Sequence, residues 1–343
     1  MRRSLVALFS SALAACGGSG LRFDGPHPTL SAPDGGSAAE PAADAGEGDA
    51  REDAGATDAT DAGSGPPYPI VLCHGFSGWS SIGPYEYFYG VPEALRADGH
   101  DVHVAEVDPF NDSITRGREL LAYVQRVLAE TGAAKVDLVA HSQGGLDARY
   151  VASELPSAVA AVVTISAPHR GTPIADLAVG AGGGPALQAE LATIFGAGGG
   201  VDLSAAMLQL TSAGAARFNS EFPDAPGVAY YSIAGRSNLA PDDGVCETAE
   251  PPFVAKWDAD RDPIGAEFAV TGAILTGNPF SPTYNDGLVP VSSAKWGEFL
   301  GCLPADHLDE IGQPAGASPG FGNPFDYKQF YRDLANWLVA QGD

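Results

Sequence analysis

Apolar residues from position 68 onward follow a pattern that predicts strands alternating with helices. Short apolar runs are typical of strands, and apolar positions three or four residues apart are typical of helices. The predicted strands are 68–73, 101–107, 135–140, 159–165 and 228–234. The predicted helices are 84–98, 115–131, a segment beginning near Gly144, and 326–340. This order indicates an α/β fold with a mostly parallel sheet, helices on both faces, and ligands bound beyond the carboxyl ends of the strands.

The stretch 174–226 interrupts this alternation. Residues 187–195 and 203–218 are short amphipathic helix candidates, and glycine-rich segments flank the first of them. Short helices between flexible hinges are typical of a lid that opens for substrate. We therefore predict a mobile helical lid at 174–226, with a static helical insertion as the alternative.

The first 66 residues differ in composition from the rest. Residues 1–16, MRRSLVALFSSALAAC, have a basic start followed by an apolar stretch too short to span a bilayer. The segment ending at Cys16 resembles the lipobox of bacterial lipoproteins, which predicts that Cys16 carries a lipid anchor in the mature protein. An ordinary cleaved signal peptide is the alternative, and both predict export, either anchored to the cell envelope or secreted.

Residues 17–66 are built largely of Asp, Ala, Gly, Glu and Thr, which bury too little apolar surface to fold. We expect a disordered tether there, and one folded domain over 67–343. The whole chain of 343 residues carries a formal charge of −25. This charge makes nucleic acid an unsuitable partner, because no basic surface is available to meet phosphates.

The stretch VDLVAHSQGG (136–145) carries the first chemical signal. It ends an apolar strand at Ser142, and Gly144 and Gly145 follow directly. Small residues around a serine at a strand-to-helix turn form the nucleophile elbow, G-x-S-x-G. Ala140 stands in place of the first glycine and is still small enough to pack there. Ser142 is therefore the candidate nucleophile, and a chance serine in a turn is the alternative.

A nucleophilic serine needs a base, and the base needs an orienting acid, in the chain order Ser, acid, His. Only His169 and His307 follow Ser142. We prefer His307, in the polar loop PADHLDE, because few acids lie between Ser142 and His169. Asp286 precedes His307 at a suitable interval and is the candidate acid, with an ordinary Asn-Asp-Gly turn as the alternative.

Two backbone N–H groups must stabilise the oxyanion of the reaction. The residue after the nucleophile, Gln143, supplies one. The other is expected from Phe76, in the loop after the first core strand, where the sequence reads His74-Gly75-Phe76. Ordinary loop glycines are the alternative interpretation of that segment.

Cysteine usage predicts one disulfide. Cys16 is assigned to the lipid anchor, and Cys73 lies in a predicted core strand as a buried thiol. Cys246 and Cys302 remain, both in loops of an exported domain, where a bridge is expected. Two free thiols are the alternative.

Taken together, these motifs resemble the true lipases of the Pseudomonas and Burkholderia type, in bacterial lipase family I. The matching stretches lie in the family's order and span most of the folded domain: YPIVLCHGFSGW (68–79), 86–107, 117–152 with HSQGG, SAPHRGTPIAD (166–176), NDGLVPVSSAKWG (285–297) and DHLDEIGQ (306–313). The resemblance implies an α/β-hydrolase fold, long-chain acylglycerols as substrates at an oil–water interface, and the roles assigned above to Ser142, Asp286, His307, Phe76 and Gln143. It also implies a dedicated lipase chaperone as a partner.

The resemblance further implies one structural calcium ion close to His307. Its ligands carry over to Asp309 and to oxygens of Gln313 and Ala317, and Asp262 matches the position of the second carboxylate. Asp260 is the fallback for that carboxylate. Calcium prefers hard oxygen ligands of these kinds. An Asp309 that only faces water is the alternative.

The function expected from these observations is ester hydrolysis through an acyl-enzyme, as in a triacylglycerol lipase. A carboxylesterase or polyester depolymerase with the same triad is the runner-up. A non-catalytic binding module is a third possibility, disfavoured because the catalytic set is complete.

Overall fold

The protein is represented by a computed structural model. The structure describes residues 65–78, 81–82, 85–180, 184–194, 204–237, 244–257, 262–277, 283–320 and 322–343. The predictions for residues 1–64, which include the lipid anchor at Cys16 and most of the tether, lie outside this part, and so does Asp260.

Six parallel strands form the central sheet, in the order β4-β1-β5-β6-β7-β8. Their bounds are β1 Ile70–Cys73, β4 Val102–Val104, β5 Val136–His141, β6 Val159–Ile165, β7 Ala229–Gly235 and β8 Glu298–Leu303. A separate antiparallel pair is formed by β2 Ser81–Ile82 and β3 Tyr85–Glu86. Because β5 lies inside the sheet, the residue that follows it emerges between the ends of neighbouring strands.

The helices fall into three groups. Those that cover the sheet are α2 Val91–Ala97, α3 Ser113–Thr131, α4 Gly144–Glu154, α9 Pro252–Ala255 and α12 Tyr327–Gln341. Those of the insertion are α5 Pro173–Val179, α6 Gly184–Ile194, α7 Ser204–Leu210 and α8 Ser212–Glu221. Shorter elements complete the fold: α10 Ala269–Thr276, α11 Val291–Ala294 and the 3₁₀ turns η1 Pro156–Ala158, η2 Ala266–Phe268 and η3 Asp309–Ile311.

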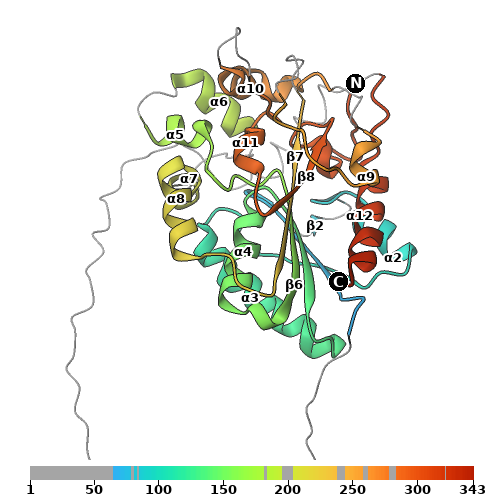
Figure 1. Cartoon of the computed structure of the whole chain (residues 1–343). Coiled ribbons are helices and arrows are strands. Elements are labelled where there is room, and N and C mark those ends of the chain that lie inside the picture. Colours follow the sequence, from blue (N-terminus) through green and yellow to red (C-terminus); the bar gives the residue numbers. More distant parts are fainter. Residues whose placement is uncertain are drawn as a thin grey trace, which may run out of the picture. The chain divides into compact units, whose positions relative to one another are not determined.

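Strand β1 shows why both faces of the sheet are covered. Its side chains alternate between the faces, and all four residues are buried. Ile70 and Leu72 belong to the core shared with α2 and α12, whereas Val71 and Cys73 belong to the core shared with α3 and α4. Figure 1 shows α3 and α4 on one side of the sheet and α2 and α12 on the other. The predicted parallel sheet with helices on both faces is confirmed.

Three local predictions need correction. The helix expected from residue 84 begins only at Val91, because β3 and a turn ending at Gly90, with φ 65°, occupy the preceding residues. The single helix expected over 203–218 is two helices, since Thr211 ends α7 and caps α8 by accepting a hydrogen bond from Gly214 N. Strand β8 was not predicted, because EFLGCL contains a glycine and begins with an exposed glutamate.

The insertion between β6 and β7 packs against α10. Leu187 and Leu191 of α6 share an apolar cluster with Leu275 of α10, and Figure 1 shows the two helices side by side. The Glu190 carboxylate accepts hydrogen bonds from the first turn of α10, at 2.7 Å from Val270 N and 2.6 Å from Thr271 N. In the described part of the chain, no helix has the length and hydropathy needed to span a bilayer.

Candidate active site

Ser142 follows β5 at a sharp turn into α4. Its backbone has φ 57°, a left-handed conformation that is uncommon for a residue other than glycine. The turn leaves no room for larger neighbours, because a Cβ on Gly144 would lie 2.6 Å from the carbonyl oxygens of both Cys73 and His74. Ala140, at the position of the missing glycine, is fully buried. The local structure is therefore the strained elbow that the motif predicts.

Asp286 and His307 lie together, as the sequence order predicts. His307 Nδ1 donates to Asp286 Oδ2 at 2.7 Å, and His307 N donates to the Asp286 carbonyl at 2.9 Å. Asp286 Oδ1 accepts from Leu288 N at 2.8 Å and from Val289 N at 2.7 Å. The carboxylate is thus fixed on both oxygens. It holds the tautomer of His307 in which Nε2 carries no hydrogen and can accept a proton.

The histidine ring lies beside the elbow. The rings of His307 and His141 are 4.4 Å apart between centroids, and His141 directly precedes Ser142. Three segments that are distant in sequence therefore meet at the carboxyl end of the sheet. His169, the rejected base, is fully buried, and its Nε2 lies 3.0 Å from Thr164 Oγ1. It stacks on Trp296, so its surroundings are those of a structural histidine.

The loop after β1 contains Phe76 and is held by a buried arginine. Arg116 donates to the carbonyls of His74 at 2.8 Å and Gly75 at 3.2 Å, while its Nε donates to Asp147 at 2.8 Å. Burial and the nearby guanidinium lower the pKa of His74 to about 3, so its ring stays neutral. It donates from Nδ1 to the Gly75 carbonyl. This loop is therefore rigid at the backbone positions where the Phe76 N–H is expected to act.

Gln143, the other expected oxyanion donor, is the N-cap of α4. Its side chain is turned away, with Nε2 donating to Asn111 O at 2.9 Å and lying 3.3 Å from Ser113 Oγ. Its backbone N–H belongs to the first turn of a helix, where such groups lack partners within the helix. The position suits an oxyanion donor, because the positive end of the helix dipole adds to the N–H group.

A cluster of three carboxylates lies just past His307. Oxygens of Asp262, Asp306 and Asp309 all lie within 4.8 Å of one another. The structure thus brings together the two predicted carboxylates and adds Asp306. Burial, together with the carboxylates of Asp262 and Glu267, raises the pKa of Asp306 to about 7.

The other predicted calcium ligands lie along the loop after Asp309. The side-chain nitrogen of Gln313 donates to the Tyr87 carbonyl at 2.9 Å. A calcium ion would therefore be bound by an oxygen of Gln313. Ala317 N donates to Pro314 O at 3.0 Å.

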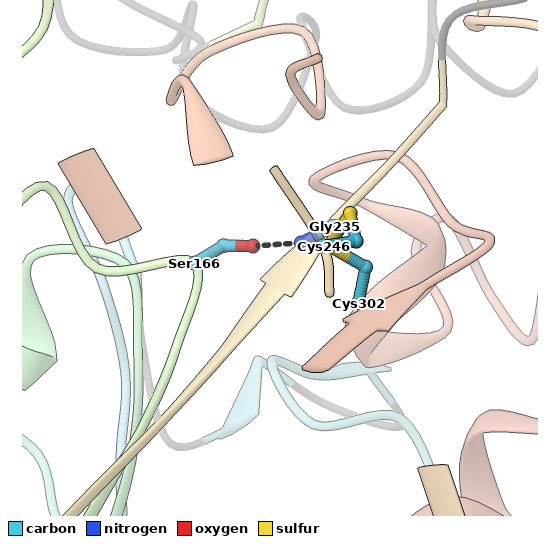
Figure 2. The surroundings of a disulfide bond; sticks show 4 residues. All are labelled: Ser166, Gly235, Cys246 and Cys302. Carbon is cyan, nitrogen blue, oxygen red and sulfur yellow. Dashed lines mark hydrogen bonds between the residues drawn. A yellow bond between two sulfur atoms is a disulfide. The ribbon is translucent and has the colours of Figure 1, made fainter. Parts of the chain in front are cut away.

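The predicted disulfide between Cys246 and Cys302 is confirmed. The prediction that both cysteines lie in loops is wrong for Cys302, which lies on β8 in register with Ala234 of β7. Figure 2 shows the bridge beside Gly235, whose N–H donates to Ser166 Oγ at 2.9 Å. The bridge therefore joins the loop at 246 to the strand that leads into the histidine loop. Cys73 is a free and buried thiol, also as predicted.

Comparison with known proteins identifies the family of this chain. A family model described as the alpha/beta hydrolase fold matches residues 68–192. The triacylglycerol lipase of Vibrio cholerae is 33% identical over 302 residues, which cover 80% of this chain and 88% of the relative. The triacylglycerol lipase of Burkholderia plantarii is 32% identical over 314 residues, covering 80% of this chain and 87% of the relative. The chain belongs to the bacterial triacylglycerol lipases.

Solved structures agree with the fold of this lipase. The Staphylococcus hyicus lipase superposes with a TM-score of 0.58 at 16% identity, over 81% of this chain and 98% of the other. The Bacillus licheniformis lipase BlEst2 gives 0.53 at 23% identity, over 72% of this chain and 89% of the other. The predicted α/β-hydrolase fold and the predicted lipase family are both confirmed.

Sequence reasoning missed several polar residues near the active site of the lipase, Asp306 and Ser166 among them. Asp306 directly precedes His307, and its spacing of three from Asp309 was the available signal for a shared metal site. Ser166 has φ 48° and is fully buried. It begins the quoted stretch SAPHRG, yet nothing in that stretch distinguishes its hydroxyl from that of an ordinary serine.

Proposed function

We propose that this lipase hydrolyses acylglycerol esters with Ser142 as nucleophile, His307 as general base and acid, and Asp286 as the orienting acid. The observation that carries the proposal is the Asp286–His307 pair packed on His141, next to a serine held at φ 57°. The relatives named triacylglycerol lipase support the choice of substrate.

The reaction follows from these positions. As Ser142 Oγ bonds to the ester carbonyl carbon, its proton passes to His307 Nε2, and the resulting imidazolium is stabilised by Asp286. The imidazolium then gives that proton to the leaving alkoxide oxygen as the C–O bond breaks, which leaves an acyl-Ser142. A water molecule repeats the sequence, losing a proton to Nε2 and releasing the fatty acid while Ser142 Oγ regains its hydrogen.

The N–H groups of Phe76 and Gln143 are proposed to hold the tetrahedral oxyanion. The hydrogen bonds from Arg116 to the loop before Phe76 keep that N–H in place before substrate arrives, so no reorganisation is needed during the reaction. Hydrolysis of emulsified triolein, compared with dissolved short-chain p-nitrophenyl esters, tests the substrate assignment. A rate on dissolved esters alone would favour the carboxylesterase alternative.

We also propose one structural calcium ion at the carboxylate cluster. Three carboxylates within 4.8 Å repel one another, and calcium binds hard oxygens of this kind. Asp262, Asp306 and Asp309 would hold the ion, with carbonyl oxygens of Gln313 and Ala317 completing the set. The ion would tie the histidine loop to the loop at 262 and would act on the geometry of His307 rather than on the ester.

Removal of calcium is expected to lower the melting temperature and the activity together. A ligand at 100 times its Kd stabilises the native state by about 2.7 kcal/mol, or about 5 °C for a domain of this size. The measurement is thermal unfolding with EGTA and again after calcium is restored. Asp309→Asn should abolish this response and Asp333→Asn, in a surface ion pair with Lys256, should keep it. A midpoint that ignores EGTA would contradict the site.

The insertion 174–226 is proposed to act as a lid, with α6 held closed by Glu190 on the first turn of α10. A carboxylate that caps a helix contributes about 1 kcal/mol. Glu190→Gln is therefore expected to raise activity on dissolved esters about fivefold and to speed proteolysis of the insertion. Glu221→Gln is the matched control, since among the described residues Glu221 forms only an exposed ion pair with Arg217. Equal rates in the two variants would argue for a static insertion.

Export and anchoring complete the proposal. We infer that residues 1–16 direct export, that Cys16 carries the lipid, and that residues 17–66 tether the domain to the envelope. The disulfide supports export, because such bridges form and persist in oxidising compartments. The resemblance to family I also supports a dedicated chaperone during folding. Radiolabelled palmitate incorporation that is lost in Cys16→Ser tests the anchor.

A further inference from the structure

A chain of buried hydrogen bonds passes beneath the active site and is not used by the triad. Gly235 N donates to Ser166 Oγ at 2.9 Å, and Ser166 Oγ donates to Glu310 Oε1 at 2.5 Å. The other oxygen, Glu310 Oε2, lies 3.0 Å from His141 Nε2, and one proton lies between them. Glu310, Ser166 and His141 are each fully buried.

The chain continues to the oxyanion loop. His141 Nδ1 lies 2.8 Å from Tyr87 Oη, and that hydroxyl reaches the Gly75 backbone. A Cβ placed on Gly75 would lie only 2.6 Å from Tyr87 Oη, so the contact is tight. The chain therefore ends one residue before Phe76.

Members of this chain adjoin the proposed catalytic segments. His141 precedes Ser142 and packs its ring on His307, 4.4 Å away. Glu310 lies in the histidine loop. Ser166 holds a left-handed backbone at φ 48° while buried, a strained conformation that persists only where surrounding bonds enforce it.

We infer that Ser166, Glu310, His141 and Tyr87 are positioning residues that fix the spacing of the elbow, the histidine loop and the oxyanion loop. This inference rests on the proposed roles of Ser142, His307 and Phe76. The physical reason is that a displacement of about 1 Å in a catalytic group lowers the rate by about 10²-fold, whereas one hydrogen bond holds such a group only modestly. A connected chain restrains all three loops at once, which separate contacts would not do.

Tyr87→Phe cuts the chain with the smallest change of shape. It is expected to lower kcat on a dissolved p-nitrophenyl ester about 10-fold at unchanged KM, because substrate binding does not use the chain. Tyr331→Phe is the matched control. Both rings pack edge-on against Phe88 in the same core. Tyr331 is 1% exposed, and its hydroxyl has no hydrogen-bond partner among the described residues. The kcat of Tyr331→Phe should match that of the wild type.

Ser166→Gly cuts the opposite end and tolerates the left-handed backbone. It should reproduce the fall in kcat at constant KM, and the double variant should lose less than the product of the two single losses, because one chain is already broken. Melting temperatures of all variants identify any loss that is due to unfolding. A kcat of Tyr87→Phe within twofold of Tyr331→Phe, or fully multiplicative losses, would overturn the inference. Ser142→Ala in the same assay separates a failure of this inference from a failure of the proposed function, since full activity of that variant would contradict the proposed function itself.

Discussion

Alanine in place of Ser142 is expected to reduce kcat for ester hydrolysis by on the order of 10⁶ while the fold is kept. The acyl-enzyme requires Oγ, and without it His307 has no positioned nucleophile to activate. Alanine has almost the same shape and meets the same strain at φ 57°, so the elbow should persist. The measurement is the initial rate on emulsified triolein and on a dissolved ester, with circular dichroism for the fold.

Ser220→Ala is the control for Ser142→Ala, because Ser220 is exposed on α8. Its rates should equal those of the wild type. If Ser142→Ala were to retain activity within tenfold of the wild type, the mechanism through an acyl-serine would have to be abandoned.

Asparagine in place of Asp286 is expected to lower kcat by on the order of 10⁴. The structure gives the reason. Asp286 Oδ1 accepts from Leu288 N and Val289 N, so the asparagine oxygen would take that side and the amide nitrogen would face His307 Nδ1. An amide N–H can only donate, which forces the imidazole hydrogen onto Nε2, where a proton from Ser142 must be received.

The neighbouring carboxylates bear on this second prediction. Glu310 is close to His307 in sequence, but its two oxygens already face His141 and Ser166. It is therefore not available to replace the acid without breaking those contacts. Asp333→Asn, at the surface, is the matched control. A loss of less than about tenfold in Asp286→Asn, measured as kcat at saturating ester, would show that another group orients His307.

The elbow was predictable from the sequence because its signals are local. A strand, small residues and a serine lie within ten positions, and each restricts the backbone in a known way. The pairing of Asp286 with His307 was predictable from the chain order Ser, acid, His and from elimination between two histidines. The bridge between Cys246 and Cys302 followed from counting the cysteines of a domain that we expect to be exported.

Other features depend on contacts between distant segments, which the sequence does not display. Ser166 and Glu310 meet through a hydrogen bond between residues that are 144 positions apart. Strand β8 forms because it pairs with β7, and its own composition does not indicate a strand. The split between α7 and α8 depends on whether Thr211 caps a helix or continues one, a choice that propensity alone leaves undecided.

The disulfide between Cys246 and Cys302 has a consequence for the proposed calcium site. It closes a ring with a sequence separation of 56, which limits the freedom of the unfolded chain by about 4 kcal/mol in the loop-entropy model. Asp262 and Asp286 lie inside this ring, and His307 and Asp309 follow shortly after it. The bridge roughly halves the path along the chain between Asp262 and Asp309, so closing the remaining loop is easier once the bridge exists. Halving this loop lowers its closure cost by about 0.6 kcal/mol. The proposed calcium ion should therefore bind about threefold more tightly during refolding when the bridge is already formed than when both thiols are reduced.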